Sequence, residues 1–564
     1  MSDQDLSEGT RSITQEALRC DDILAEIFQY LHPSSMTSRA MQSDCQRALV
    51  CCARVNKAFS HYALNSIWCE LDNEKFALNI LPSFQEIVYN YGRRYRTSLW
   101  DRLESTYVRI LPIAGWLKVD AHLLQHLQGE ISPAEVERFH SYAIRVRSIR
   151  VSAEEKPGIR SVVIQQIAAL TGGCLFPALN RLECSYYEMR DSLKDIIPSM
   201  LSPTLQHLFI GEKHVYNLED KLERDLESTI QDIVTTCTLL RQVELYGLCK
   251  HVDVVSLVNA CKDLRDISMP LCSVSNAVFR GLSALPKLTK LSLNIHQIDI
   301  EAGTCRQFCT LTELKLGGSD RQMSDFILSG EFHTVQMLEI AFTSVSSMES
   351  AHTCLLHVAS KCSASLRILR LGLKNGSQIC DGALVDLISP FSPAIHLRSI
   401  RVNLCSMKVT YAAGNFQQFA FTWPEIEDFT LGYACNDAIR FEPHTSCLQM
   451  LFDIASVFPR LRNVTLPSLE PLPHVELQTY GLTQHGLERA AFKDGEAIER
   501  ASLDDAPIRR LLTLLVSIFP TLKLDYNGTG WEYLRESYTT IFKEMMKQMS
   551  KIQQMKMEES TAIE

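Results

Sequence analysis

One spacing of apolar residues recurs along most of the chain: aliphatic side chains at the first, fourth and sixth positions of a six-residue unit. In the L-x-L half of the unit, the two apolar side chains point to one side of a strand and the middle residue to the other. The steps between units average about 29 residues. The pattern therefore predicts twelve short strands, in units that begin at Val146, Leu179, Leu205, Leu240, Leu264, Leu288, Leu311, Val335, Leu366, Leu397, Ile426 and Leu461.

Helix-like stretches separate the predicted strands, for example SVVIQQIAAL, LESTIQDIVTTC and CLQMLFDIASVF. A proline often precedes the strand, as in FPAL, LPKL and WPEI, and it ends the helix there. Strands stacked in parallel would bury their apolar sides in one continuous core. The sequence thus predicts an α/β solenoid with parallel strands on the concave face and helices on the convex face. It resembles a divergent leucine-rich-repeat array; the alternative is an α/β domain without repeats.

The N-terminal part has a different pattern. Apolar residues at helical spacing predict helices over residues 17–31, 47–59 and 61–71, with a polar loop over residues 34–44 between the first two. Pro33 is expected to close the first helix. Three short helices form only a marginally stable core on their own. The segment is therefore expected to pack against a partner or against the next domain.

The segments DDILAEIF, LVCCARVNKAF and ALNSIW, in this order and spacing, resemble an F-box of the divergent form common in large fungal protein families. The usual Leu-Pro opening is replaced by Arg19-Cys20, and the usual Trp near the end of the second helix is Phe59. The resemblance implies docking on a Skp-type adaptor, which bridges the chain to a cullin-based ubiquitin ligase. The alternative is a generic three-helix cap packed on the solenoid.

The predicted helices carry more apolar residues than so small a bundle needs, which indicates an apolar surface for the adaptor. The resemblance implies that Cys20 and Asp22 flank this surface. By contrast, Trp68 and Leu71 are expected to join the third helix to the connector. The predicted adaptor-binding residues are Cys20, Asp22, Ile23, Leu24, Leu49, Cys52, Val55 and Phe59.

The middle residue of L-x-L identifies a second candidate surface. In three of the later units this residue is Lys315, Arg370 or Arg401. The units of Arg370 and Arg401 are neighbours, so the two side chains are expected about 4.8 Å apart. We hypothesise that the three cations bind an acidic or phosphorylated segment of a target. Glu339, in the unit before Arg370, offers the alternative: an ion pair that makes the patch structural.

Composition narrows the function further. The net charge of -10, with no basic stripe, argues against nucleic acid as a partner. The apolar run LLTLLVSIFP, from Leu511, has about half the length that spans a bilayer, and MSDQDLSEGT lacks a signal-peptide pattern. The expected protein is soluble and cytoplasmic or nuclear. Its 19 cysteines include no C-x-x-C pair and are expected to be reduced thiols. No metal or cofactor is expected.

The expected organisation is a disordered terminus over residues 1–15, an F-box over 16–72, a helical connector over 73–140, the repeat solenoid over 141–526, and a helical or mobile tail over 527–564. Nucleotide-binding and hydrolase motifs are absent. The favoured function is a non-catalytic substrate receptor of a Skp–cullin–F-box (SCF) ubiquitin ligase. The alternatives are a leucine-rich-repeat scaffold with a degenerate F-box, and an enzyme with its site in the solenoid or connector.

Overall fold

The computed structural model describes residues 20–32, 39–71, 75–81, 84–88, 123–127, 131–152, 158–185, 193–211, 220–246, 254–300, 306–373, 381–404, 408–412, 414–433, 439–441, 446–468, 485–494, 506–526, 543–555 and 558. The chain divides into two compact units, Met1–Leu264 and Arg265–Glu564.

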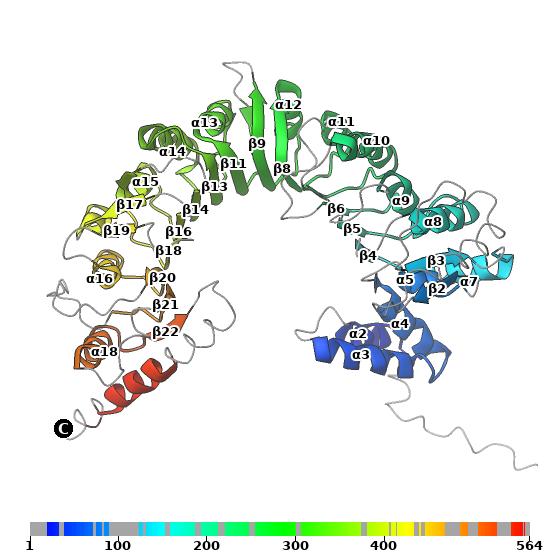
Figure 1. Cartoon of the computed structure of the whole chain (residues 1–564), viewed down its shortest axis with the longest axis horizontal. Coiled ribbons are helices and arrows are strands. Elements are labelled where there is room, and N and C mark those ends of the chain that lie inside the picture. Colours follow the sequence, from blue (N-terminus) through cyan, green and yellow to red (C-terminus); the bar gives the residue numbers. More distant parts are fainter. Residues whose placement is uncertain are drawn as a thin grey trace, which may run out of the picture. The chain divides into compact units, whose positions relative to one another are not determined.

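The first unit combines N-terminal helices with a parallel sheet in the order β1-β4-β5-β6-β7. Helices α8 to α11 cover one face of this sheet, and no described element covers the other face, which we call the uncovered face (Figure 1). The elements are α2 Asp21–Tyr30, α3 Arg39–Cys52, α4 Lys57–Trp68, β1 Glu70–Leu71, α5 Lys75–Leu78, β2 Phe84–Val88, β3 Leu123–Leu127, α7 Pro133–Ala143, β4 Ser148–Ser152, α8 Gly158–Leu170, β5 Arg181–Ser185, α9 Leu193–Met200, β6 His207–Ile210, α10 Asp220–Thr236, β7 Gln242–Leu245 and α11 Val255–Ala260.

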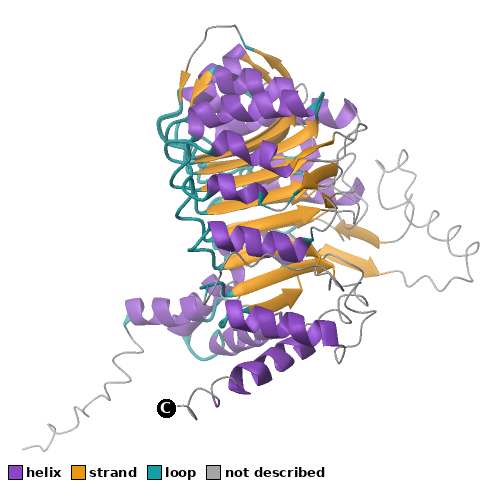
Figure 2. Cartoon of the chain, turned by 90° about the vertical axis from the view of Figure 1, so that its left-hand side faces the viewer, coloured by secondary structure: helices purple, strands orange, loops and turns teal. Residues whose placement is uncertain are grey.

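The second unit repeats the alternation of strand and helix. Its main sheet is parallel, in the order β8-β9-β11-β13-β14-β16-β18-β20-β21-β22, and its helices lie on one face (Figure 2). Two small parallel sheets, β10-β12 and β15-β17-β19, are separate from the main sheet. The elements are β8 Asp266–Ser275, α12 Asn276–Ser283, β9 Lys290–Asp299, β10 Arg306–Gln307, β11 Glu313–Ser319, α13 Asp320–Leu328, β12 Gly330–Glu331, β13 Met337–Ser344, α14 Met348–Cys362, β14 Ile368–Leu373, β15 Asp381–Ala383, α15 Leu384–Ile388, η2 Ser389–Phe391, β16 Ser399–Leu404, β17 Lys408–Tyr411, η3 Asn415–Phe419, β18 Asp428–Tyr433, β19 Ile439–Phe441, α16 Cys447–Val457, β20 Asn463–Ser468, β21 Arg489–Asp494, α18 Ala506–Ile518 and β22 Lys523–Tyr526.

All twelve predicted strands are present, and each begins two residues after the first apolar position of its unit. In β14, for example, Leu369 and Leu371 are buried under the helices, while Arg370 between them lies on the uncovered face. Leucine-rich-repeat architecture, with helices on one face of parallel strands, is therefore confirmed. Three further strands belong to these sheets. Strand β22 follows the helix-proline pattern of RRLLTLLVSIFPTLKL, which indicates a final repeat. Strand β1, at the end of the third helix, and β21, within residues 467–505 where the sequence indicates an irregular insertion, were not predicted.

Hydroxyl groups link consecutive repeats just before the strands. The side chain of Thr310 donates to the Leu288 carbonyl (2.7 Å), and that of Thr334 donates to the Leu311 carbonyl (2.8 Å). Leucine-rich repeats usually place an Asn or Cys three residues after the last Leu for this purpose; in this chain Cys405 is the clear match to that position, and it lies outside the described residues. Ser and Thr thus satisfy carbonyl groups between neighbouring repeats from the opposite end of the strand. Further bonds of this kind include Thr204 to Leu179, Ser365 to Val335 and Thr521 to Leu487.

Helices α2, α3 and α4 form a small helical module with its own core. Leu24, Phe28, Leu49 and Ala63 are buried together. The second helix differs from the prediction of residues 47–59: α3 begins at Arg39, within the expected polar loop, and ends at Cys52. Asn56 then caps α4, because its side chain accepts a hydrogen bond from the Phe59 N–H (2.9 Å). Val55 therefore lies in a turn and Phe59 on the third helix.

Two further segments differ from the expected organisation. Residues 73–140, expected to be a helical connector, include the antiparallel pair β2 and β3 as well as α5 and the start of α7. In the tail, where an exposed helix or a mobile segment was expected, residues 543–555 form a helix, but its Met545 and Met549 are fully buried. The terminus over residues 1–15 lies outside the described residues.

The end of α4 is attached to α7 and to the sheet, whereas Trp68 and Leu71 were expected to join it to the connector over residues 73–140. The Trp68 ring lies 5.0 Å from the Tyr142 ring on α7, and Leu71 is buried in β1, in register with Ile149 of β4. Arg145, just after α7, donates to the His61 carbonyl (3.3 Å) and to the Asn65 side chain. The helical module is thus fixed to β4 and α7 by both backbone and side-chain contacts.

Replacing Trp68 with alanine is expected to lower the free energy of unfolding of the helical module by about 2 kcal/mol. A fully buried ring would cost about 3–5 kcal/mol, but Trp68 is only half-buried. Hydrogen–deuterium exchange of α4 would measure the loss, with Trp68→Phe as the control that keeps a ring against Tyr142. Unchanged exchange in Trp68→Ala would show that this contact does not hold the module.

His485 is expected to make the second unit sensitive to acid. The ring is buried, its Nδ1 accepts from the Leu487 N–H (3.1 Å), and its Nε2 therefore carries the proton and donates to the Phe458 carbonyl (3.1 Å). Burial lowers the pKa of His485, while the bond to Phe458 opposes the shift. The neutral ring therefore stabilises the fold above pH about 6.5, the ordinary value, and this stability is lost as the pH falls towards the lower folded-state pKa.

Urea midpoints at pH 7.5 and 5.5 would test this expectation. The wild type should lose more stability between the two pH values than His485→Gln, which has no titrating group at this position. Equal losses in the two proteins would contradict the assigned role.

Candidate functional site

The helical module has an apolar surface as well as an apolar core. Ile23, Ile27 and Tyr30 follow one another at helical spacing along the outer side of α2, where they are 41%, 41% and 72% exposed. We call these three residues the outer stripe. Val50 on α3 and Val55 in the following turn are also exposed. Of the fourteen large apolar side chains that are exposed in the described residues, six lie in this module: Ile23, Ile27, Tyr30, Met41, Val50 and Val55.

The eight predicted adaptor-binding residues divide into three groups. Cys20, Asp22, Ile23 and Val55 are exposed, as docking requires. Leu24 and Leu49 are fully buried in the module core, so their assignment to a surface is wrong. Cys52 and Phe59 are half-buried and pack against the same core. Sequence reasoning missed Ile27, Tyr30, Met41 and Val50, although the i, i+4, i+7 spacing from Ile23 was a usable signal.

The three predicted target-binding cations lie where the pattern placed them, on the uncovered face of the second unit. Register pairs Lys315 of β11 with Glu339 of β13, Glu339 with Arg370 of β14, and Arg370 with Arg401 of β16. We call Lys315, Arg370 and Arg401 the basic column. Arg370 and Arg401 are therefore neighbours, while Glu339 separates them from Lys315.

Glu339 forms ion pairs with two of the three cations. Its carboxylate lies 3.9 Å from Lys315 Nζ and 3.6 Å from Arg370 Nη1, and all three side chains are more than a third exposed. Ion pairs of this length and exposure contribute about 0–1 kcal/mol, so they do not saturate the cations. Arg401 is exposed, has Thr430 of β18 as its other neighbour, and forms no ion pair with any described residue. The predicted ion-pairing role of Glu339 therefore explains part of the charge compensation of Lys315 and Arg370.

Metal-ligating side chains do not gather in the part of the chain that the structure describes. Within those residues, no three His, Cys, Asp or Glu side chains gather as metal ligands would. Nor does any described helix have the length and apolar character needed to cross a bilayer. Some cysteine thiols are buried and hydrogen-bonded to the backbone. Cys237 donates to the Ser202 carbonyl and Cys261 to the Cys237 carbonyl, both at 3.5 Å. Burial raises the pKa of Cys237 to about 12, which leaves its thiol protonated and unreactive.

Known proteins resemble this chain in structure only. No protein-family model matches the sequence, and no curated protein matches it. The chain is 12% identical to TLR13 in its complex with ssRNA13, over 63% of this chain and 54% of that one, with a TM-score of 0.28. It therefore spans about half the length of the TLR13 chain.

Two further solved structures are similar. The leucine-rich repeat-containing protein LegL7 from Legionella pneumophila is 12% identical, over 57% of this chain and 93% of that one, with a TM-score of 0.32. The yeast Rad7 and Elc1 complex matches at 14% identity, over 59% of this chain and 73% of that one, with a TM-score of 0.31. Likeness at this level carries no argument about function. The assignment to leucine-rich repeats rests on the strands, register and helices of this chain.

Proposed function

We propose that this chain is the substrate-recognition subunit of an SCF-type ubiquitin ligase. The helical module, an F-box by its sequence resemblance, binds a Skp-type adaptor and through it a cullin, while the repeats bind a target protein. The chain itself is non-catalytic, because such a receptor only positions the target for other subunits. The observation that carries the proposal is the exposed apolar surface formed by the outer stripe, Val50 and Val55.

This surface is surplus to the folding of the module. The core is already filled by Leu24, Phe28 and Leu49, and Phe28 packs at 5.7 Å against the Phe59 ring. The outer stripe lies on the adjacent side of the same helix, about 100° around its axis from Leu24 and Phe28, and is exposed to water. Removing apolar area from water is worth about 25 cal/mol per Å², so a partner that covers this surface gains binding energy there. A concentration of exposed apolar side chains on so small a module is typical of an interaction site.

Copurification tests the proposal. The chain and a Skp-type adaptor would be coexpressed, with an affinity tag on one of them, and the eluate analysed by size exclusion. A stoichiometric complex supports the receptor function. A folded chain that leaves the adaptor behind would favour the alternative, a leucine-rich-repeat scaffold with a degenerate F-box. Turnover of any substrate by the purified chain alone would contradict the non-catalytic assignment.

The basic column supplies a target surface within this proposal. Arg370 and Arg401 lie side by side, and Gly372, two positions after Arg370 on the same strand, carries no side chain. Two adjacent guanidinium groups match the geometry of a carboxylate or a phosphate. We expect an acidic or phosphorylated segment of the target to bind here.

Reversing both charges, Arg370→Glu with Arg401→Glu, is expected to weaken binding of an acidic peptide by about tenfold or more, with adaptor binding intact. Fluorescence anisotropy with a labelled ten-residue polyglutamate would measure it. Glu339→Gln is the matched control: it removes the competing carboxylate and should strengthen binding. Equal affinity of wild type and the double variant at low and high salt would exclude this surface.

A further inference from the structure

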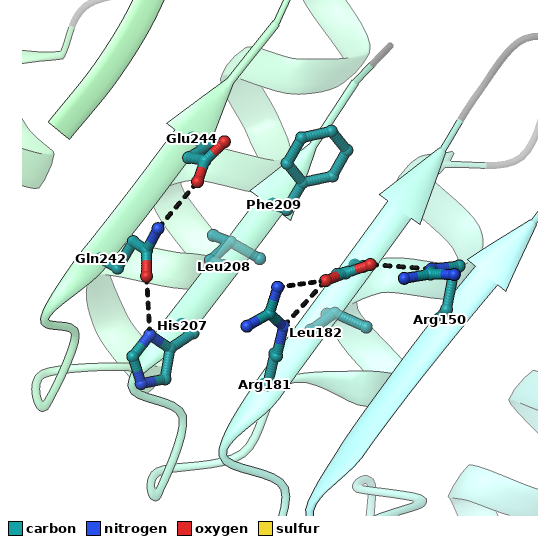
Figure 3. A pocket seen from close by; sticks show the side chains of 9 residues that line it. Arg150, Arg181, Leu182, His207, Leu208, Phe209, Gln242 and Glu244 are labelled. Atoms are coloured by element: carbon teal, nitrogen blue, oxygen red, sulfur yellow. Dashed lines mark hydrogen bonds and ion pairs between the residues drawn. The ribbon is translucent and has the colours of Figure 1, made fainter. Parts of the chain in front are cut away.

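The uncovered face of the first unit contains a hollow of about 430 Å³ across strands β4 to β7 (Figure 3). Its walls are side chains that alternate with the buried leucines of these strands. Register places Arg150, Glu183, Phe209 and Glu244 in one row, and Arg181, His207 and Gln242 in the row beside it. The hollow has the size of a small-ligand or side-chain pocket.

One end of the hollow is cationic and already ordered. The two oxygens of Glu183 accept from Arg150 Nε and Arg181 Nε, each at 2.8 Å. Burial raises the pKa of Glu183, but the hydrogen bonds from the two arginines outweigh it, and the pKa lies below its ordinary value. The carboxylate is therefore ionised, and this end has a net charge of +1. Both arginine side chains remain more than half exposed, so a second anion can reach them.

The other end of the hollow is anionic. Gln242 Nε2 donates to a Glu244 oxygen (2.7 Å), which fixes the amide so that its oxygen accepts from His207 Nδ1 (3.0 Å). Glu244 forms no ion pair with any residue that the structure describes. Between the two ends stands the Phe209 ring, which lies 5.4 Å from the Tyr246 ring (Figure 3).

The charges of the hollow balance, since two arginines face two glutamates. A polyanion such as nucleic acid gains nothing from such a surface, and neither does a polycation. A ligand complementary to both ends of the hollow has one negative group and one positive group. Between them it has an apolar group that lies over Phe209. Glu183 and Glu244 are two strands apart, which is about 10 Å. An extended peptide covers this distance in about three residues.

We propose that the hollow binds an extended peptide segment of the target in which an acidic and a basic residue lie three positions apart, with an aliphatic or aromatic residue between them. The acidic side chain binds Arg150 and Arg181, and the basic one pairs with Glu244 beside the Phe209 ring. This inference rests on the proposed receptor function and specifies what the receptor recognises. The arginines, held by Glu183, lose little further side-chain freedom on binding, which favours affinity.

Selection from a library of random twelve-residue peptides displayed on phage, against the full chain, tests the proposal. The bound pool is expected to be enriched in acidic and basic residues three apart around an apolar residue. The charge-reversing variant Glu244→Lys is expected to change the selected basic residue to an acidic one. A synthetic peptide from the wild-type pool should lose about tenfold in affinity for Glu244→Gln or Arg181→Gln.

Arg370→Glu, outside the hollow, is the matched control and should leave this motif unchanged. A wild-type pool without the charge pair, or the same pool for wild type and Glu244→Lys, would overturn the site. The selection needs no adaptor, so its outcome is separate from that of the proposed function. Loss of adaptor binding would refute the ligase role and leave the motif standing.

Discussion

Ile27→Asp combined with Val55→Asp is expected to weaken adaptor binding by about 100-fold or more while the chain stays folded. Ile27 and Val55 are 41% and 63% exposed, so aspartate at either position meets water in the free protein. In the complex, each aspartate would place a charge at a position where the adaptor buries an aliphatic side chain. The expected loss of binding free energy is about 2 kcal/mol or more per site. Isothermal titration with a purified Skp-type adaptor would measure the effect.

Two controls separate docking from folding. Ile395→Asp with Phe421→Asp changes two other exposed apolar residues, in the second unit, and should leave adaptor binding unchanged. Leu24→Asp places a carboxylate in the module core. The substitution is expected to lower the free energy of unfolding by about 4 kcal/mol, which is more than so small a core can lose, and should therefore unfold the module. Full adaptor affinity in the Ile27 and Val55 double variant would show that the adaptor does not bind this surface.

Asp453→Ala is expected to produce the largest loss of stability in the second unit, about 3–5 kcal/mol. Asp453 is fully buried on α16, and its oxygens accept from the Tyr411 hydroxyl, the Gly414 N–H (2.7 Å) and Gln449 Nε2 (3.0 Å). Gly414 has φ +81°, a left-handed conformation that glycine adopts readily, at the residue before η3. Removing the carboxylate leaves three hydrogen-bond donors without the acceptor that they share.

Urea unfolding and hydrogen exchange of α16 and η3 would measure this loss. Asp386→Ala is the matched control, because Asp386 is an exposed aspartate on the neighbouring helix α15 and should change stability little. Equal unfolding midpoints for the two variants would show that the buried carboxylate does not hold η3 against α16.

The repeat strands could be predicted from the sequence because their cause is local. Burying two side chains of L-x-L fixes which residue faces out, so the positions of Arg370 and Arg401 followed from the pattern alone. Strand β21 was missed because RAAFKD has only short apolar residues and one phenylalanine, and its strand pairing comes from β20 and β22. Similarly, β1 has two residues, and only its pairing with β4 makes it a strand.

The candidate sites could be predicted only in part, because their geometry depends on distant residues. Helix α2 has apolar residues on two sides, and its sequence does not say whether Ile23 or Leu24 faces the core; α4 decides it, through Ala63. The apolar spacing of Leu49, Cys52, Val55 and Phe59 predicted one continuous helix. Asn56, a residue that favours the start of a helix, indicated instead that a new helix begins after it, but this signal was given less weight. The hollow joins residues from four strands, and no local pattern indicates it.

Hydrogen–deuterium exchange of the intact chain, with and without a purified Skp-type adaptor, tests the central claim most directly. The adaptor is expected to slow exchange in peptides covering α2 and the segment from Val50 to Val55, and to leave exchange in the strands of both sheets unchanged. Protection confined to the sheets, or no protection in the helical module at saturating adaptor, would contradict it.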